Sequence, residues 1–126
     1  MEIDILLGKT LISIERLKEG YEDAGNDNVL IFTTDTNEKY KAFHDQDCCE
    51  TVEIYDIEGN LNDLIGSPLT QAEEYSNSDD PPSNDDLDRS WTWTFYKFAT
   101  IKGYVTIRWL GESNGYYSES IDFIKL

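Results

Sequence analysis

Apolar and polar residues alternate with a period of two along most of the chain, which is typical of β-strands with one buried face. Ile12 and Ile14, for example, alternate with Leu11, Ser13 and Glu15. A shorter run at 29–34 is almost wholly apolar and reads as a buried strand. The strands predicted in this way are residues 10–15, 29–34, 38–44, 52–57, 69–75, 91–99, 104–110 and 118–124.

Helical signals are limited to residues 60–66, where apolar side chains stand at positions 61, 64 and 65. Asn60 can cap the start of a short helix there and Gly66 can end it. Residues 35–37 and Lys102-Gly103 predict hairpin turns. The pattern therefore predicts a mainly β (β-rich α+β) fold of seven to eight short antiparallel strands with one short helix, arranged as a single sheet, a sandwich or a barrel.

The 126 residues suffice for one domain, so we expect a single domain over 1–126. Its most biased segment, Glu73 to Asp88, holds seven acidic residues, two prolines and no basic residue. Proline cannot continue a central strand, and like charges repel one another. We therefore expect a flexible acidic loop at about residues 76–89.

Charge narrows the classes of function, because 26 acidic residues against ten basic ones give a net charge of −16. Proteins that bind nucleic acid through its backbone use clustered Lys and Arg, so direct nucleic-acid binding is excluded. Docking to an anionic membrane is disfavoured for the same reason. Dense carboxylates could instead imitate the phosphates of DNA and inhibit a protein with a basic groove, although a solvated acidic surface is the simpler interpretation.

The first ten residues lack a basic segment followed by a long apolar run, and no stretch approaches the ~18 apolar residues of a membrane helix. We therefore expect a soluble, intracellular protein. The only cysteines, Cys48 and Cys49, are adjacent. A disulfide between neighbours cannot close a loop across a domain, so this cysteine count is typical of a reducing compartment.

The densest group of reactive side chains is 44–50, which contains the only histidine, both cysteines and three carboxylates. His44 with Cys48 or Cys49 could form a base and nucleophile of a small enzyme. A zinc site is disfavoured because the chain offers at most three nitrogen or sulfur ligands, and we expect no metal or cofactor. The favoured interpretation is structural, with the cysteines packed as small hydrophobes while His44 and Gln46 satisfy buried backbone groups.

Aromatic residues form a second candidate site, because Trp91, Trp93 and Phe95 share one face of a strand while Tyr96 and Phe98 point the other way. One of these faces belongs to the core, and the other could be exposed. Exposed rings beside a basic residue could stack a nucleobase and pair a phosphate. The predicted binding residues are Trp93, Tyr96, Tyr104, Arg108, Tyr116 and Tyr117, with His44 and Asp47 from the 44–50 group.

Several motifs together resemble an uncharacterised family of small proteins found in tailed bacteriophages and prophages. They are 44–50, with its His-x-Gln-Asp-Cys-Cys-Glu pattern, then 56–57, 63–66, 72–74, 91–97, 99–103 and 113–118. The resemblance covers nearly the whole chain and implies a phage origin and the host cytoplasm as location. It implies no activity and no catalytic residue.

These observations favour a phage-encoded acidic binding protein, not an enzyme. We expect it to modulate a host process, with anti-defence activity as the leading version. It would do so by sequestering a small nucleotide-type ligand or by occupying a host protein surface. A small enzyme using His44 with Cys48 or Cys49, and an acidic DNA-mimic inhibitor, are the alternatives. The sequence is also compatible with a homo-oligomer.

Overall fold

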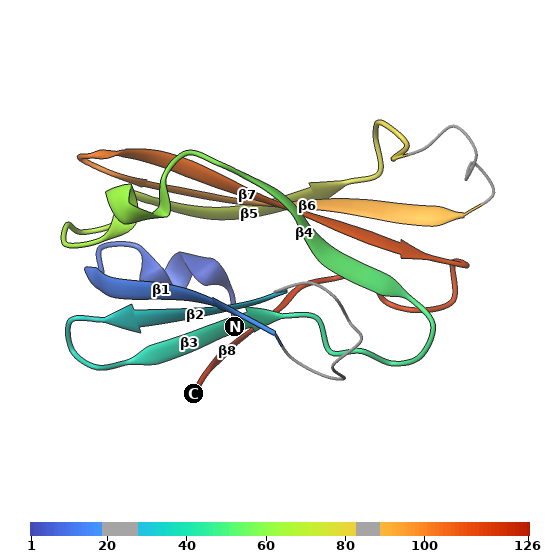
Figure 1. The fold of residues 1–126 in the computed structure, drawn as a ribbon, viewed down its shortest axis with the longest axis horizontal. Coiled ribbons are helices and arrows are strands. Elements are labelled where there is room, and N and C mark those ends of the chain that lie inside the picture. Colours follow the sequence, from blue (N-terminus) through green and yellow to red (C-terminus); the bar gives the residue numbers. More distant parts are fainter. Residues whose placement is uncertain (19–27, 83–88) are drawn as a thin grey trace.

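Two antiparallel sheets pack face to face in the computed structural model, which describes residues 1–18, 28–82 and 89–126 (Figure 1). The strands are β1 (Leu11–Leu17), β2 (Val29–Thr34), β3 (Lys39–Phe43), β4 (Thr51–Glu58), β5 (Gln71–Asn77), β6 (Ser90–Thr100), β7 (Gly103–Ser113) and β8 (Asp122–Lys125). One sheet has the order β1-β2-β3-β8 and the other β4-β7-β6-β5. The mainly β, antiparallel prediction is confirmed, and its arrangement is an open sandwich.

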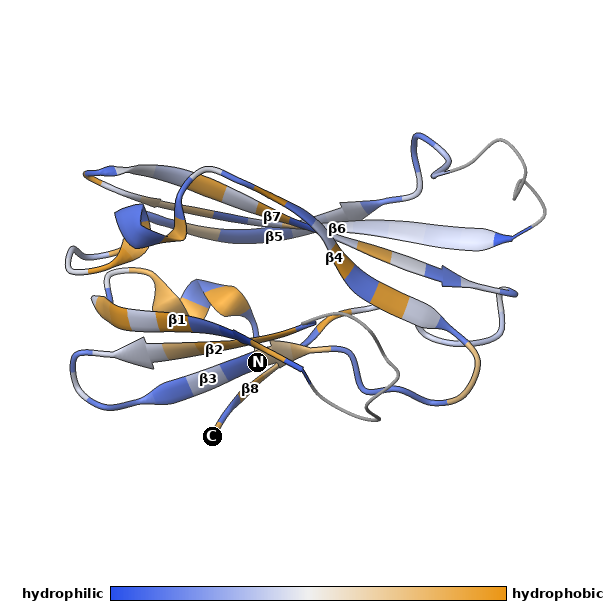
Figure 2. Cartoon of the chain, viewed as in Figure 1, coloured by the Kyte–Doolittle hydropathy of each residue, from blue (hydrophilic) through white to orange (hydrophobic). Residues whose placement is uncertain are grey.

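The core lies between the two sheets, where the inward side chains of facing strands meet. Phe32 of β2 and Phe98 of β6 come from opposite sheets, with ring centroids 5.6 Å apart. Tyr40 and Phe123 stack within the β1-β2-β3-β8 sheet at 5.6 Å. Apolar positions interrupt polar ones along the strands, as Figure 2 shows. Burial of each such ring contributes roughly 2–3 kcal/mol, so this alternation holds the two layers together.

Local turn chemistry follows the sequence closely. Strands β2 and β3 form the predicted hairpin, and Asn37 in its turn adopts a left-handed conformation with φ of 65°. The predicted short helix is the 3₁₀ helix η2 (Leu61–Leu64). The Asn60 side chain accepts a hydrogen bond from the amide of Asn62, and Gly66 has a φ of 86°. These caps explain why the helix is confined to one turn.

Two elements differ from the sequence prediction. The last strand begins at Asp122, so the expected strand over 118–124 is wrong for residues 118–121. Glu119 in that segment is buried against the other sheet, where it accepts a hydrogen bond from Thr92 over 2.8 Å. This contact replaces strand pairing. The chain also starts with an unpredicted 3₁₀ helix, η1 (Ile3–Leu6), which is too short to show a helical period.

The expected acidic loop is in part a strand. Ser76 and Asn77 belong to β5, where they pair with Thr94 and Trp93 of β6. Residues 83–88 lie outside the described part of the chain. Only the start of the acidic segment is therefore corrected, because backbone pairing with β6 extends β5 further than side-chain composition indicates.

Candidate functional site

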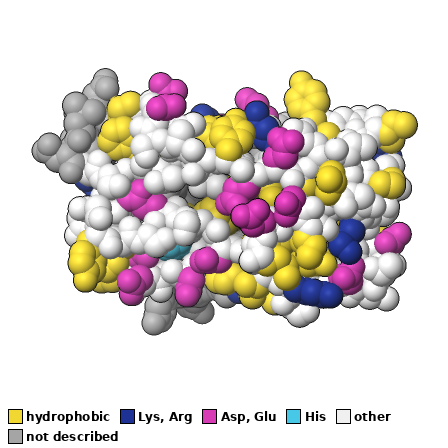
Figure 3. Space-filling view, turned by 180° about the vertical axis from the view of Figure 1, so that it is seen from behind, with side chains coloured by type: hydrophobic (Ala, Val, Ile, Leu, Met, Phe, Trp, Pro, Cys, Tyr) yellow, Lys and Arg dark blue, Asp and Glu magenta, His cyan; other side chains and the backbone are white. Residues whose placement is uncertain are grey.

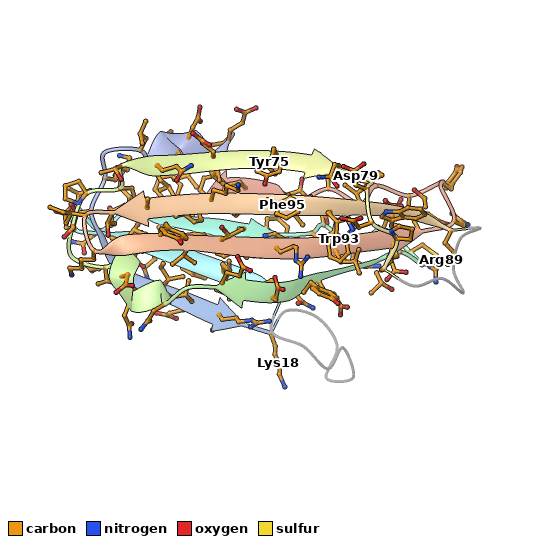
Figure 4. The ribbon with its side chains drawn as sticks, turned by 90° about the horizontal axis from the view of Figure 1, so that it is seen from above. Lys18, Tyr75, Asp79, Arg89, Trp93 and Phe95 are labelled. Atoms are coloured by element: carbon orange, nitrogen blue, oxygen red, sulfur yellow. A yellow bond between two sulfur atoms is a disulfide. The ribbon has the colours of Figure 1, made fainter. Side chains whose placement is uncertain are left out.

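The outer face of the β4-β7-β6-β5 sheet carries a row of aromatic side chains, which we call the aromatic face. It consists of Tyr55, Tyr75, Trp91, Trp93 and Phe95 together with the cation of Arg108. Figure 4 looks onto this side of the sheet and labels Tyr75 of β5 and, on the neighbouring strand β6, Phe95 and Trp93. The division of β6 that the sequence predicts is thus confirmed, because Tyr96 and Phe98 on its other side are fully buried.

One half of the aromatic face is a stacked pair. The rings of Tyr75 on β5 and Phe95 on β6 lie 4.8 Å apart, with only 13° between their planes. The ammonium group of Lys97 lies 4.9 Å from the centre of the Tyr75 ring. A hydrogen bond with Tyr75 raises the pKa of Lys97. Tyr75 is 43% exposed, so a flat ring with a cation beside it faces solvent.

The other half holds Arg108 between two rings. Its guanidinium carbon lies 4.8 Å from the Tyr55 ring centre and 4.9 Å from that of Trp93. Arg108 also donates two hydrogen bonds to Asp56, 3.0 Å from Nε to Oδ1 and 2.5 Å from Nη2 to Oδ2. The bond with Asp56 raises the pKa of Arg108. Because Asp56 already occupies its fork, Arg108 is a rigid part of the surface and not a free phosphate ligand.

The acidic segment is fixed to the edge of this aromatic face by two indole groups. Trp91 Nε1 donates to the carbonyl of Asp79 over 3.0 Å, and Trp93 Nε1 donates to the carbonyl of Asp80 over 2.9 Å. The backbone is therefore held at residues 79 and 80 while the carboxylates stay available to a partner. This arrangement brings acidic side chains beside the aromatic ones.

The structure distributes the predicted binding residues over several places. Trp93 and Arg108 meet on the aromatic face, and Tyr104 points outward from the start of β7 with 76% of its surface exposed. Tyr116 and Tyr117 lie in the connection after β7, with ring centroids 5.1 Å apart. Tyr96 is a correction, because its fully buried ring packs against Trp109 in the core and cannot contact a ligand at the surface.

Sequence reasoning missed Tyr55 and Tyr75 as members of the aromatic face. Tyr75 pairs with Phe95 across β5 and β6, so alternation along both strands could have found it once the pairing was known. Tyr55 alternates with the buried Val52 and Ile54 of β4, so the period of two by itself places it on the outer face. The sequence does not show that β4 lies two strands from β6 in the sheet, which brings Tyr55 to within 5.0 Å of Trp93.

The 44–50 group forms a loop around one buried carboxylate. Glu50 Oε2 accepts hydrogen bonds from His44 Nε2 over 2.9 Å and from the amide of Asp47 over 3.0 Å. Its Oε1 accepts bonds from the amide of Cys48 over 2.9 Å and from Gln46 Nε2 over 3.0 Å. Burial by itself raises the pKa of Glu50, but the bonds from His44, Cys48 and Asp47 outweigh it and lower the pKa to about 2.

His44 is a structural link and not a free base. Its Nδ1 lies 2.7 Å from the backbone oxygen of Ser120, on the segment that precedes β8. Both ring nitrogens thus lie within hydrogen-bond distance of an oxygen atom, which fixes the orientation of the imidazole. The expectation that His44 and Gln46 bond backbone groups is confirmed, since Gln46 Nε2 donates to the Glu50 carbonyl over 2.6 Å.

The cysteines depart from the expectation that they are packed hydrophobes in the reduced form. Cys48 and Cys49 are exposed, and a disulfide joins them. Burial was the wrong prediction for the cysteines, because the buried side chains of this loop are those of His44 and Glu50. In this state the pair offers no thiolate, and the ring of His44 bonds Glu50 instead of a sulfur.

Comparison with known protein families shows which family the chain belongs to. Residues 4–123 match a family described as Domain of unknown function (DUF7448). The chain belongs to this family. No curated protein and no solved structure matches the sequence.

Two further features of this DUF7448 domain bear on its chemistry. In residues 1–18, 28–82 and 89–126, no three His, Cys, Asp or Glu side chains stand together as a metal site would require. No helix in the same ranges is long and apolar enough to cross a membrane.

Proposed function

We propose that this DUF7448 domain is a phage-encoded binding protein that modulates a host process in the bacterial cytoplasm by docking its aromatic face onto a host protein. Anti-defence activity is the leading version of this role. The phage origin rests on the resemblance of the sequence motifs. The observation that carries the binding role is the aromatic face itself, on which Tyr55 is 52% and Tyr75 43% exposed.

The chemistry of the aromatic face indicates what kind of partner it fits. Tyr, Trp, Phe and Arg are the residues enriched at protein interfaces, where rigid rings supply contact area at small entropic cost. Carboxylates surround the rings, with Asp79 and Asp80 at one edge and Glu73 beside Lys97 on the neighbouring strand. A partner with a basic rim around an apolar centre complements this pattern.

Rigidity supports the same proposal. Arg108 is held by Asp56 and two rings, and Trp93 is only 6% exposed. Side chains that are already ordered lose little entropy when a partner binds, so more of the contact energy appears as affinity. The acidic net charge of −16 would also speed encounter with a basic partner at low salt.

A nucleotide-type ligand is the second candidate function, and the stacked pair of Tyr75 and Phe95 favours it. A nucleobase could stack on these rings while Lys97 meets a phosphate. Arg108 contributes less than the sequence alone suggested, because Asp56 neutralises its charge. The DNA-mimic alternative would depend on the carboxylates alone, and the enzyme alternative would need a reduced cysteine pair.

The experiment is affinity capture from bacterial cells with a tagged protein, in wild-type form and as two matched variants. Tyr75→Ser removes a ring that is 43% exposed on the aromatic face, and Ile124→Ser removes a side chain that is 41% exposed on β8. We expect Tyr75→Ser to weaken partner binding about tenfold or more, as truncation of an aromatic anchor does. Ile124→Ser should bind as the wild type does.

Salt and a third set of variants separate the candidate functions. A docked host protein should lose affinity steeply with ionic strength and with Asp79→Asn plus Asp80→Asn, because exposed charges are screened. A nucleotide should show a weak salt dependence and a strong loss with Lys97→Ala. An equal loss of partner affinity in Tyr75→Ser and in Ile124→Ser would contradict binding at the aromatic face. Self-association abolished by Tyr75→Ser would identify a second copy as the occupant.

A further inference from the structure

The inner face of β6 changes character along its length. Tyr96 and Phe98 pack in the core, whereas the residues before them on the same face carry hydroxyl groups, namely Ser90, Thr92 and Thr94. Side chains of a sandwich strand that point inward are normally apolar. A run of hydroxyls at this end of the inner face therefore indicates that something other than the second sheet lies against it.

A cavity of about 310 Å³ lies over this hydroxyl-lined end of the sheet. Its floor is formed by the hydroxyls of β6 with Ser76 and Glu74 of β5, and its wall is the segment that leads to β8. Glu119 in this wall is 8% exposed and bonds Thr92 and Ser113. The volume is at the lower end of the range for small-molecule sites, so it suits a small ligand.

The wall of the cavity packs closely against β7. A side chain at Gly111 would bring its Cβ within 2.7 Å of both the Cβ and the carbonyl oxygen of Glu119, so only glycine lets this segment approach β7. On its other side the segment is tied to the His44 imidazole through the carbonyl of Ser120. The cavity is thus a fixed part of the sandwich.

Two polar side chains that line the cavity make no hydrogen bond or ion pair with another side chain among the described residues. Thr94 is 3% exposed, lines the cavity, and makes no side-chain hydrogen bond within the described residues. Glu74 is exposed at the mouth of the cavity and makes no ion pair or side-chain hydrogen bond in the same part of the chain. Burial, followed by the nearby charge of Glu2, raises the pKa of Glu74, which is the effect of a carboxylate without a cation beside it.

We propose that this cavity binds a small organic cation with an ammonium group, held by Glu74 and Glu119 and by the hydroxyls of β6. An ammonium group has three donors and no acceptor, so it complements carboxylates and hydroxyl oxygens. The cavity lining contains no Lys or Arg that would compete for the carboxylates. The ring of Tyr117 in the lining can contact the apolar part or the charge of such a ligand. This site is separate from the aromatic face and does not depend on the docking proposal.

Figure 3, which views the molecule from behind, shows several acidic side chains near the middle of this face. An acidic surface attracts any cation loosely, so the test must distinguish the cavity from this general attraction. Glu73 and Glu74 supply the control, because they are neighbours on β5 with the same charge. Glu74 lines the cavity, whereas Glu73 does not line it and stands opposite Lys97 in the register of β5 and β6.

The experiment is titration of the full chain with 1,4-diaminobutane at low salt, followed by calorimetry and by amide shifts in NMR spectra. We expect saturable binding of one molecule, with shift changes at Thr92, Thr94 and Tyr117. Glu74→Gln should weaken binding about tenfold, the effect of one charge-assisted hydrogen bond, and Glu73→Gln less than about twofold. Thr94→Val should also weaken binding while the melting temperature stays near that of the wild type.

Equal weakening by Glu73→Gln and Glu74→Gln would overturn the proposal, because it would show a diffuse ion atmosphere. If Glu74→Gln weakened binding of the diamine but Thr94→Val did not, the amine would lie on the other side of Glu74, near Glu2. This result would also overturn the proposal. Butane-1,4-diol has the same length without charge. If this diol bound as well as the diamine, the site would recognise hydroxyls and the assignment of a cationic ligand would be wrong.

Discussion

Two carboxylates, Glu50 and Asp56, each bind a nitrogen-containing side chain, but they lie in opposite surroundings. Glu50 is 4% exposed, and its partners are His44, Gln46 and backbone amides of its own loop. Asp56 lies on the outer face of a sheet and holds Arg108 between two rings. The buried carboxylate organises backbone, whereas the surface one orders a side chain that a partner can reach. The number of hydrogen bonds alone therefore does not distinguish a structural site from a binding site. What distinguishes them is whether the bonded groups lie in the interior or on the surface.

The largest expected effect is on stability at Glu50. Glu50→Ala leaves the amides of Asp47 and Cys48 and the ring of His44 without their acceptor, a carboxylate that is itself buried. We expect a loss of about 3 kcal/mol in the free energy of unfolding, measured with denaturant. Asp47→Ala is the control, because its side chain is exposed and only its amide takes part. A loss below about 1 kcal/mol for Glu50→Ala would remove the distinction between the two carboxylates.

Acid should reveal the same site. The hydrogen bonds to Glu50 lower its pKa from the ordinary 4.5 of a glutamate to about 2 in the folded protein, so its carboxylate favours folding above pH 4.5. This contribution is lost as the pH falls from about 4.5 to about 2, because protonation then favours the unfolded chain. Hydrogen bonds with Lys9 and Lys125 also lower the pKa of Glu38 to about 2. The measurement is therefore the difference in the free energy of unfolding between wild type and Glu50→Gln. This difference should become smaller as the pH falls from about 4.5 to about 2.

Arg108 should matter less for stability than Glu50. Arg108→Ala removes a half-exposed ion pair and two contacts with rings, for an expected loss of about 1 kcal/mol. Arg108→Lys keeps the charge but loses the planar fork that bonds Asp56 twice, so it should recover only part of that loss. Both variants should weaken partner capture more than they lower the melting temperature. A loss at Arg108 as large as that at Glu50 would mean that the aromatic face is a structural element.

The smallest expected effect is at the cysteines. Cys48→Ser together with Cys49→Ser should change the free energy of unfolding by less than about 0.5 kcal/mol, because both side chains are exposed and a bridge between neighbours closes almost no loop. Thermal unfolding of the double variant measures this directly. A large loss would show that the sulfurs support the Glu50 loop.

Much of the architecture was accessible from the sequence. Alternation placed the strands, their antiparallel hairpins and the split of β6 into two faces, because a period of two is a local property of a pleated chain. Asn60 and Gly66 likewise predicted the ends of the short helix. The prediction of a strand was wrong for residues 118–121, because these residues also alternate in the sequence. Only the buried contact of Glu119 with the other sheet shows that they do not form a strand.

The candidate sites were accessible only in part. The sequence by itself determined that aromatic residues of β6 lie on one face and that reactive side chains cluster at 44–50. Only the tertiary structure decided that Tyr55 and Tyr75 join that face, that Tyr96 leaves it, and that Glu50, not the cysteines, is buried. The physical reason is that sequence order reports neighbours along one strand, whereas burial and charge pairing arise between strands far apart in the chain.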